Sequence, residues 1–203
     1  MGYENAKKGF ERCMKKLGLE YLDLLLIHHP YGDVYGAWKA MSEFYNEGRI
    51  KALGVSNFYE GKFTEFCEIS EIKPMVNQIE THPFYTHYSA LENMKQYGCI
   101  PQAWAPLAEG KHGIFTHPVL SEIGEKYGKT AAQTALRWNV QRGVSIIPKS
   151  VHKERIEQNF NISDFTLTDD EMKRIDALDT GRSEIIDIND PGAVKFLLSI
   201  KVD

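Results

Sequence analysis

Apolar runs typical of buried strands alternate with helical patterns five times along this chain. The first run, Tyr21 to Ile27, follows a segment in which apolar residues recur every three or four positions between Ala6 and Leu17. A continuous apolar run of this kind indicates a strand buried on both faces. The predicted strands are residues 21–27, 50–55, 74–79, 100–104 and 144–147. Their alternation with helices is typical of parallel βαβ units, so we predict an α/β fold.

The predicted helices lie between these strands and beyond them. They span residues 6–17, 34–46, 61–69, 88–97, 118–127 and 131–141, with another from about residue 153. Gly18 is expected to end the first helix. Thr168 as N-cap and Glu171 three residues later match a capping box, which predicts one more helix. After Asp179 the sequence is loop-like before a short apolar end at residues 194–200, and no linker divides the chain, so we predict one domain over residues 1–203.

A doubly wound open sheet and a TIM barrel both fit this periodicity. No glycine-rich phosphate-binding turn follows the first strand, which argues against the open sheet of dinucleotide-binding proteins. Polar or aromatic residues stand at the end of every predicted strand, as expected for the active-site rim of a barrel. They are His28-His29, Ser56-Asn57, Gln78 with Glu80, Trp104 and Lys149-Ser150. We therefore predict a partial (β/α)₈ barrel with about five of the eight strands, because 203 residues fall short of the roughly 250 that a complete barrel uses.

Composition narrows the range of functions. The net charge of -4 offers no basic stripe for a phosphate backbone, so we do not expect nucleic acid as a partner. The longest apolar run, Leu24 to Ile27, is too short to cross a bilayer, and no apolar signal core follows Met1. The three cysteines are odd in number and lack CxxC spacing, which argues against a disulfide framework and a zinc site. We predict a cytoplasmic protein without a metal.

One motif has the chemistry of an anion site. Ile147-Pro148-Lys149-Ser150 ends a predicted strand, and Arg155 and Asn159 follow on the next helix. Ser150 can cap that helix, whose N-terminus attracts negative charge. Lys149 adds a point charge, and Arg155 adds a planar guanidinium suited to bidentate phosphate binding or to stacking on a base. A solvent-facing helix with ordinary surface charges explains the motif equally well.

Hydroxyl and amide groups stand at two other strand ends. Ser56, Asn57 and Gln78 can pair with a carboxamide, which both donates and accepts hydrogen bonds. A turn that caps the following helix is the alternative explanation of Ser56-Asn57. Trp104 can stack on a flat heteroaromatic ring, although a core aromatic explains this residue better when it is taken alone.

The remaining histidines have simpler explanations. His82 and His87 are separated by a segment containing Pro83, so they share no helix face for a metal, and we interpret both as surface or loop residues. His29 is expected on the opposite side of the chain from His28, because successive residues of an extended segment alternate.

Five segments, in this order, make the chain resemble the aldo-keto reductase family, and more narrowly its bacterial diketogulonate-reductase-like members. The resemblance extends from Gly2 to about Asp179. It implies a TIM barrel and NADPH-dependent reduction of aldehydes and ketones to alcohols, with small keto sugars and dicarbonyls among the expected substrates. The segments are DLLLIHHP at 23–30, GVSNF at 54–58, NQIE at 77–80, AWAPL at 103–107, and IPKS at 147–150 with Arg155 and Asn159.

The resemblance also implies a role for each site residue. His28 is expected to orient the substrate carbonyl, whereas the nicotinamide carboxamide is held by Ser56, Asn57 and Gln78. Trp104 replaces an aromatic residue, usually tyrosine, that stacks on the nicotinamide ring. The remaining residues are expected to hold the rest of the cofactor. Leu107 would lie along the pyrophosphate, and Lys149, Ser150 and Arg155 would bind the adenosine 2′-phosphate. Gln158 stands where many members carry an acidic residue that touches the adenine, and Asn159 follows it in the sequence.

Members of the family begin with three more strands, which carry a catalytic aspartate, a tyrosine general acid and a lysine that lowers the tyrosine pKa. Those motifs do not occur in residues 1–203. We therefore expect impaired reduction for lack of a proton donor, with Tyr31 and Tyr35 as poor substitutes. The alternative is a catalytically silent remnant with residual nucleotide binding or an assembly role. An unrelated phosphate-binding barrel enzyme would leave Ser56-Asn57 and Gln78 unexplained.

Five strands are too few to close a barrel whose geometry requires eight. The strands at residues 21–27 and 144–147 would then each present an unpaired edge, which favours pairing with another chain. We therefore expect self-association through these open edges.

Overall fold

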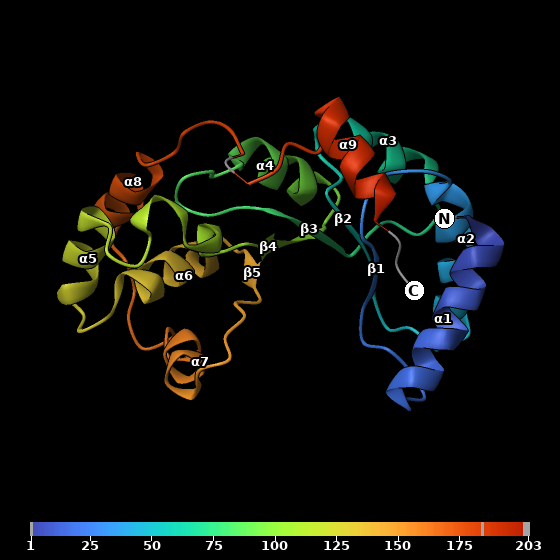
Figure 1. Ribbon diagram of the computed structural model, residues 1–203, viewed down its shortest axis with the longest axis horizontal. Coiled ribbons are helices and arrows are strands. Elements are labelled where there is room, and N and C mark those ends of the chain that lie inside the picture. The colour runs from blue at the N-terminus through green and yellow to red at the C-terminus, as the bar shows by residue number, and fades with distance from the viewer. Residues whose placement is uncertain (1, 184, 201–203) are drawn as a thin grey trace. The chain divides into compact units, whose positions relative to one another are not determined.

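The computed structural model describes residues 2–183 and 185–200, in which helices and strands alternate along most of the chain (Figure 1). The elements are α1 (Tyr3–Leu17), β1 (Leu25–Ile27), α2 (Val34–Asn46), β2 (Leu53–Ser56), α3 (Glu60–Ile69), β3 (Val76–Glu80), α4 (Tyr88–Gln96), β4 (Ile100–Trp104), a 3₁₀ segment (Ala108–Gly113), α5 (Pro118–Glu125), α6 (Ala131–Gln141), β5 (Ser145–Ile146), α7 (Lys153–Phe160), α8 (Asp169–Asp176) and α9 (Pro191–Ser199).

The sheet follows the order of the chain, β1-β2-β3-β4-β5. The β1–β2 and β2–β3 pairs are parallel, with Leu25 opposite Leu53 and Val55 opposite Asn77. These observations confirm the predicted α/β fold. The chain divides into two compact units, Met1–Ile79 with Tyr88–Gln102 and Glu80–His87 with Ala103–Asp203.

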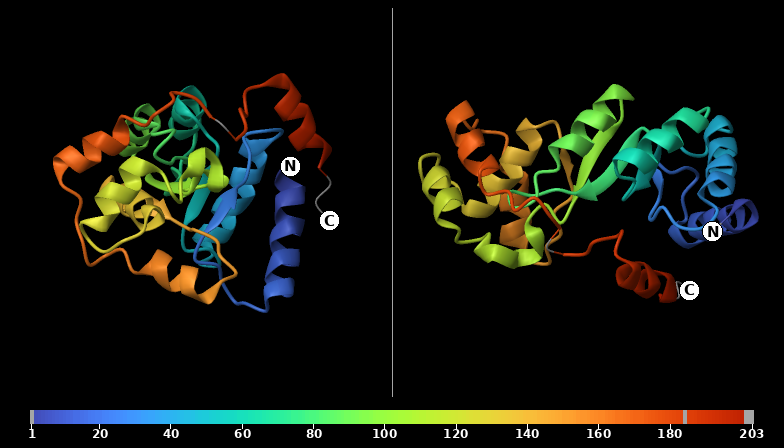
Figure 2. Two further views of the ribbon diagram at one scale, coloured as in Figure 1. Left: turned by 60° about the vertical axis from the view of Figure 1, so that its left-hand side comes forward. Right: turned by 90° about the horizontal axis from the view of Figure 1, so that it is seen from above.

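The first unit packs helices α1 to α4 around the strands from β1 to β4. Helices α1 and α2 lie side by side (Figure 2), with the rings of Phe10 and Phe44 stacked 4.1 Å apart. Phe66 of α3 packs against Trp38 and Phe58 at ring distances of 5.1 and 5.0 Å. Aromatic burial of this extent supplies much of the apolar contact that holds the helices on the sheet.

Local signals explain where the helices of this unit begin and end. The α2 helix spans the predicted residues, because the Asp33 side chain caps it by accepting from the Gly36 backbone N–H at 2.8 Å. A Cβ at Gly36 would overlap that carboxylate, so the cap requires glycine. Gly18 adopts φ 66° and ends α1 as predicted.

The first strand is shorter and less buried than predicted. Only Leu25–Ile27 form β1, and Leu22 pairs with Ile50 through an isolated bridge. Leu24, Leu25 and Leu26 are half-buried, so the prediction of a strand buried on both faces is wrong. The reason is its place in the sheet, because an outermost strand has one neighbouring strand instead of two.

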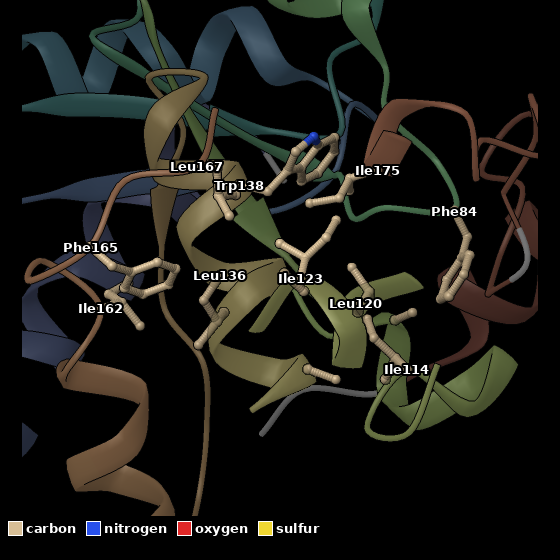
Figure 3. Close-up of a cluster of buried hydrophobic side chains, with 13 residues drawn as sticks. Phe84, Ile114, Leu120, Ile123, Leu136, Trp138, Ile162, Phe165, Leu167 and Ile175 are labelled. Atoms are coloured by element: carbon tan, nitrogen blue, oxygen red, sulfur yellow. The ribbon is translucent and has the colours of Figure 1, made fainter. Parts of the chain in front are cut away.

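The second unit has its own hydrophobic core. Helix α6 is the centre of this core, where Leu136 and Trp138 meet Leu120 and Ile123 of α5 (Figure 3). The indole N–H of Trp138 donates to Asp176 Oδ1 at 2.8 Å, which satisfies the one polar atom of this buried ring.

Two capping boxes fix helices of the second unit. The predicted box at the start of α8 is confirmed, with Thr168 and Glu171 bonded reciprocally. Thr130 and Gln133 form a second box at the start of α6. Each box satisfies backbone N–H groups that would otherwise lack a partner.

The segment after Asp179 ends in a helix, although the sequence predicted only an apolar end. Asp190 caps α9 by accepting from the Ala193 N–H at 2.8 Å, and Pro191 occupies the first helical position. Before this helix, Ser183 donates to Glu80 Oε2 at 2.6 Å. Within residues 2–183 and 185–200, every helix falls short of the length and apolarity needed to cross a membrane.

Candidate functional site

Four predicted residues of the first unit lie together at the ends of β1 and β2 and on the neighbouring part of β3. Ser56 Oγ donates to the Gln78 carbonyl at 2.9 Å. Asn57 Nδ2 lies 3.1 Å from both the His28 carbonyl and Ser56 Oγ. The structure therefore brings His28, Ser56, Asn57 and Gln78 into one hydrogen-bonded group.

Asn57 is the residue on which this group depends. Its backbone adopts φ 63°, a left-handed conformation that asparagine tolerates better than most residues. The Asn57 N–H donates to the Gln78 carbonyl at 2.9 Å, and only 4% of the residue is exposed. The turn explanation of Ser56-Asn57 is thus correct in part, because Asn57 turns the chain and bridges His28 and Gln78. Neither residue caps the following helix, whose N-cap is Tyr59 without a side-chain cap.

The amide of Gln78 is held by a residue that the sequence analysis missed. Gln78 Nε2 donates to Gln102 Oε1 at 2.7 Å. Gln102 lies on β4 two residues before Trp104, and the alternation of strand side chains could have placed it on the same face. Trp104 itself is only partly buried, whereas its neighbour Ala103 is fully buried.

His28 and His29 lie face to face, so the prediction that they point to opposite sides is wrong. Their ring centroids are 4.3 Å apart with an interplanar angle of 25°. The strand ends at Ile27 and residues 28–30 form a bend, where the alternation of an extended strand no longer holds. His28 is exposed to solvent, and His29 is half-buried.

A cavity of about 350 Å³ lies in the second unit. Its lining contains Leu107, which was predicted along the pyrophosphate, and the five residues predicted at the adenosine end, which are Lys149, Ser150, Arg155, Gln158 and Asn159. Three further lining residues, Phe115, Thr130 and Ala132, were missed. Thr130 carried a signal, since its spacing to Gln133 matches a capping box, but Phe115 lies in a loop without periodicity.

The lining is electrostatically suited to an anion. Among the described residues, it contains two cations, Lys149 and Arg155, and no aspartate or glutamate. In the described part of the chain neither of these two cations pairs with a carboxylate. The nearby Lys153, in contrast, has its Nζ 3.8 Å from Glu157 Oε1. Thr130 and Ala132 bring the N-terminal turn of α6 to the same cavity, and a helix N-terminus also favours negative charge.

Ser150 does not cap α7, which corrects the prediction. The helix begins at Lys153 with His152 at the N-cap position and no side-chain cap. Ser150 Oγ instead accepts from the His152 N–H at 3.2 Å. Two residues separate Ser150 from the helix, so its hydroxyl forms a local turn in front of the helix.

The loop that carries Leu107 and Phe115 has an unusual backbone. Ala105, Ala108, Glu109 and His112 adopt φ values of 48°, 48°, 50° and 54°. A non-glycine residue in this left-handed conformation lowers the stability of the fold by about 1 kcal/mol or more. Backbone strain of this kind tends to cluster near binding sites.

The other histidines and tyrosines do not extend either site. His82 is fully buried, which corrects the surface interpretation, and its Nε2 lies 3.1 Å from Glu80 Oε1. Burial raises the pKa of Tyr35, the opposite of what a proton donor at neutral pH needs. Among residues 2–183 and 185–200, no three His, Cys, Asp or Glu side chains are grouped as metal ligands would be.

Comparison with known proteins identifies the family. Residues 1–180 match the aldo/keto reductase family. The chain is 46% identical over 179 residues to the uncharacterized oxidoreductase YtbE of Bacillus subtilis, covering 88% of this chain and 63% of YtbE. It is 44% identical over 178 residues to the glyoxal reductase of the same organism, covering 87% and 64%.

A solved structure agrees with this result. The aldo-keto reductase of Bombyx mori in complex with NADP has a TM-score of 0.85 and 31% identity, over 92% of this chain and 66% of that chain. The chain thus spans less than two thirds of the length of the curated relatives it matches. The five-stranded α/β fold corresponds to part of the barrel of these enzymes. The chain belongs to the aldo/keto reductase family of oxidoreductases.

Proposed function

We propose that this chain binds NADPH and serves in the reduction of small aldehydes and ketones to alcohols. The observation that carries the proposal is the cavity of the second unit, whose lining, within the part of the chain that the structure describes, has two cations and no carboxylate. A 2′-phosphate distinguishes NADPH from NADH, and an arginine and a lysine on one cavity are suited to bind it.

The residues of the cavity have complementary tasks in this proposal. Lys149 and Arg155 neutralise the 2′-phosphate, and Ser150 offers a hydroxyl beside them. Gln158 and Asn159 provide hydrogen-bonding groups for the adenine, and Leu107 provides an apolar contact for the pyrophosphate segment. A fixed cavity with a few converging polar groups is typical of cofactor sites.

The hydrogen-bonded group of the first unit would receive the reacting end of the cofactor. Ser56, Asn57 and Gln78 supply the amide and hydroxyl groups that a carboxamide requires. The expected stacking role of Trp104, a partly buried residue of the second unit, stays a proposal from the resemblance. When bound, NADPH supplies the hydride that reduces the carbonyl carbon. His28, whose ring is exposed, would orient the carbonyl oxygen by a hydrogen bond.

Reduction of a carbonyl also requires a proton donor. Reduction of a carbonyl leaves an alkoxide that must gain a proton, and the aspartate, tyrosine and lysine motifs of the resemblance do not occur in residues 1–203. We therefore propose that turnover by this chain is weak. Nucleotide binding without turnover is the second candidate, favoured by the cavity being lined from the second unit alone.

Glyoxal reductase among the relatives makes a small dicarbonyl the first substrate to test. We also propose a cytoplasmic location, where the three free thiols would stay reduced.

Titration calorimetry with NADPH, NADH and 2′,5′-ADP tests the binding proposal. We expect NADPH and 2′,5′-ADP to bind at least about tenfold more tightly than NADH, because a charge-assisted pair contributes roughly 1.5 to 3 kcal/mol. Arg155→Met should remove most of this preference. The exposed Lys153→Met, on the same helix but outside the cavity lining, is the matched control. Equal affinities for NADPH and NADH would overturn the proposed cofactor.

Turnover separates the two candidate functions. NADPH consumption with methylglyoxal that is lost in His28→Ala would support the reductase. Tight NADPH binding without consumption would support the silent nucleotide-binding chain, and failure to bind any of the three nucleotides would contradict both.

A further inference from the structure

The ring of His29 lies between two other rings in the bend after β1. It stacks on His28 at 4.3 Å and on Tyr31 at 5.6 Å, with interplanar angles of 25° and 13°. Three nearly parallel rings within four residues form a column that begins at the exposed His28 and includes the half-buried His29. Stacked rings restrict one another's tilt, because their preferred arrangement is face to face with an offset.

One ring nitrogen of His29 faces an amide that is itself fixed. Asn57 Nδ2 lies 3.4 Å from His29 Nδ1. Because an amide nitrogen only donates, Nδ1 is the acceptor, and the proton of the neutral ring is on Nε2. The two Asn57 N–H hydrogens also face the closer His28 carbonyl and Ser56 Oγ, both at 3.1 Å, so His29 Nδ1 shares one of them. Asn57 is buried and its backbone N–H donates to the Gln78 carbonyl, so His29 is linked to the middle of β3.

The charge state of His29 agrees with this geometry. Burial lowers the pKa of His29, and the neighbouring His28 lowers it further. The ring is therefore neutral near pH 7. A protonated ring would direct an N–H at the N–H of Asn57, and the contact would be lost.

The ring of His28 has few contacts besides its stack on His29. Within residues 2–183 and 185–200 its ring nitrogens make no hydrogen bond, and its carbonyl, rather than its side chain, accepts from Asn57. An exposed imidazole without a partner rotates between rotamers on a fast timescale. The stack on His29 is the contact that restricts it.

We propose that His29 is a positioning residue, which Asn57 holds in place and whose ring fixes the plane of the His28 imidazole. This inference rests on the proposed function, in which His28 orients a carbonyl oxygen. Misplacement of a catalytic group by about 1 Å can cost roughly a hundredfold in rate, so a residue that fixes such a group affects kcat more than KM for the cofactor.

Three variants of His29 test the proposal. His29→Phe keeps a flat ring, His29→Leu removes the ring, and His29→Gln keeps a polar partner for Asn57 without a ring. In two-dimensional NMR of histidine side chains we expect the His28 ring protons to lie upfield in the wild type, because of the stacked ring. The shift should persist in His29→Phe and disappear in both His29→Leu and His29→Gln.

The same variants are expected to differ in kcat according to whether they keep a ring at position 29. With methylglyoxal as the probe, kcat should fall roughly tenfold to a hundredfold in His29→Leu and His29→Gln, while KM for NADPH stays within about twofold. In His29→Phe kcat should recover in part, because the stacked ring is kept and the contact with Asn57 is lost. Tyr21→Leu, which removes an exposed ring of the same unit, is the control and should leave both parameters unchanged.

His28 proton shifts that do not change in His29→Leu and His29→Gln would overturn the proposal. Equal loss of kcat in His29→Phe and His29→Leu would overturn it too, because the ring would then not be what matters. A wild-type chain without turnover would refute the proposed reductase, and the NMR result would still decide whether His29 positions His28. If His29→Leu does not fold, His29→Gln and His29→Phe give the same comparison.

Discussion

At the scale of single residues, the cavity of the second unit depends on a side chain with no sequence signal. Phe115 is 55% exposed although its ring lines the cavity. The backbone of Gly110 packs against it, since a Cβ at Gly110 would lie 3.3 Å from Phe115 Cε2. An exposed ring held in this way is suited to stack on a base.

We expect Phe115→Ala to weaken binding of 2′,5′-ADP by roughly fivefold or more, because base–aromatic stacking contributes about 1 to 3 kcal/mol. Phe115→Trp should bind at least as well as the wild type. Phe160→Ala is the matched control, because that ring is 88% exposed on α7 and does not line the cavity. Titration calorimetry of the four proteins measures the effect, and an unchanged affinity in Phe115→Ala would show that the ring does not contact the base.

Residues with local chemistry could be predicted from the sequence, and residues that depend on distant contacts could not. Thr168 and Glu171 form the predicted capping box because both partners lie on one helical turn. Ser150 was assigned as a cap from its position alone, but the start of α7 at Lys153 decides what its hydroxyl reaches. The contact of His29 with Asn57 joins residues 28 positions apart, so only the fold could reveal it.

At the scale of helices and strands, Glu171 links three segments of the second unit. Its carboxylate accepts hydrogen bonds from Lys126 and Tyr127, which follow α5. The same carboxylate also forms the capping box at the start of α8. Burial raises the pKa of Glu171, but the hydrogen bonds from Thr168, Tyr127 and Lys126 lower it to about 2. A buried carboxylate of this kind stabilises the folded state only while it is ionised.

The resulting pH dependence has a definite sign. The folded-state pKa of about 2 lies below the ordinary value of 4.5, so the stabilisation is complete above pH 4.5 and is lost as the pH falls toward 2. We expect Glu171→Gln to lower the free energy of unfolding by roughly 2 to 3 kcal/mol at pH 7 and to flatten its dependence on pH in this window. Urea unfolding at pH 7, 4 and 3 measures both effects.

The control is Asp170→Asn, an exposed neighbour in the same helical turn, which should change the free energy of unfolding by less than about 0.5 kcal/mol. A loss as large as that of Glu171→Gln in this variant would contradict the assignment.

Helix positions were more predictable than strand positions for a physical reason. The bounds of α2 and α6 agree with the prediction, because helical periodicity and caps are properties of contiguous residues. The predicted strand at 21–27 shrank to Leu25–Ile27, and the one at 144–147 to Ser145–Ile146. These are the two outermost strands of the sheet, and their length depends on partners that the local sequence does not specify.

At the scale of the whole molecule, the order of the sheet leaves β1 and β5 each with one neighbouring strand among the residues that the structure describes. The Leu25 N–H donates to the Ala52 carbonyl at 3.1 Å, which places the N–H of Leu25 on the β2 side of the strand. Backbone groups alternate in direction along a strand, so the N–H of Leu26 points to the opposite, outer edge. Leu24 to Leu26 are half-buried apolar residues of this segment. Such an edge favours pairing with a second chain.

We therefore predict that the chain self-associates through β1, and a pair of proline variants tests this. Leu26→Pro removes an N–H that does not bond to β2, so it should leave the fold intact and shift the chain toward monomer. Leu25→Pro removes the N–H bonded to Ala52 and should destabilise the first unit by about 3 kcal/mol or more. Light scattering coupled to size exclusion over a hundredfold range of concentration gives the mass of each species, and circular dichroism during heating gives its stability. A wild-type chain that stays monomeric at every concentration, or a Leu26→Pro variant that associates as strongly as the wild type, would show that the β1 edge is not the contact.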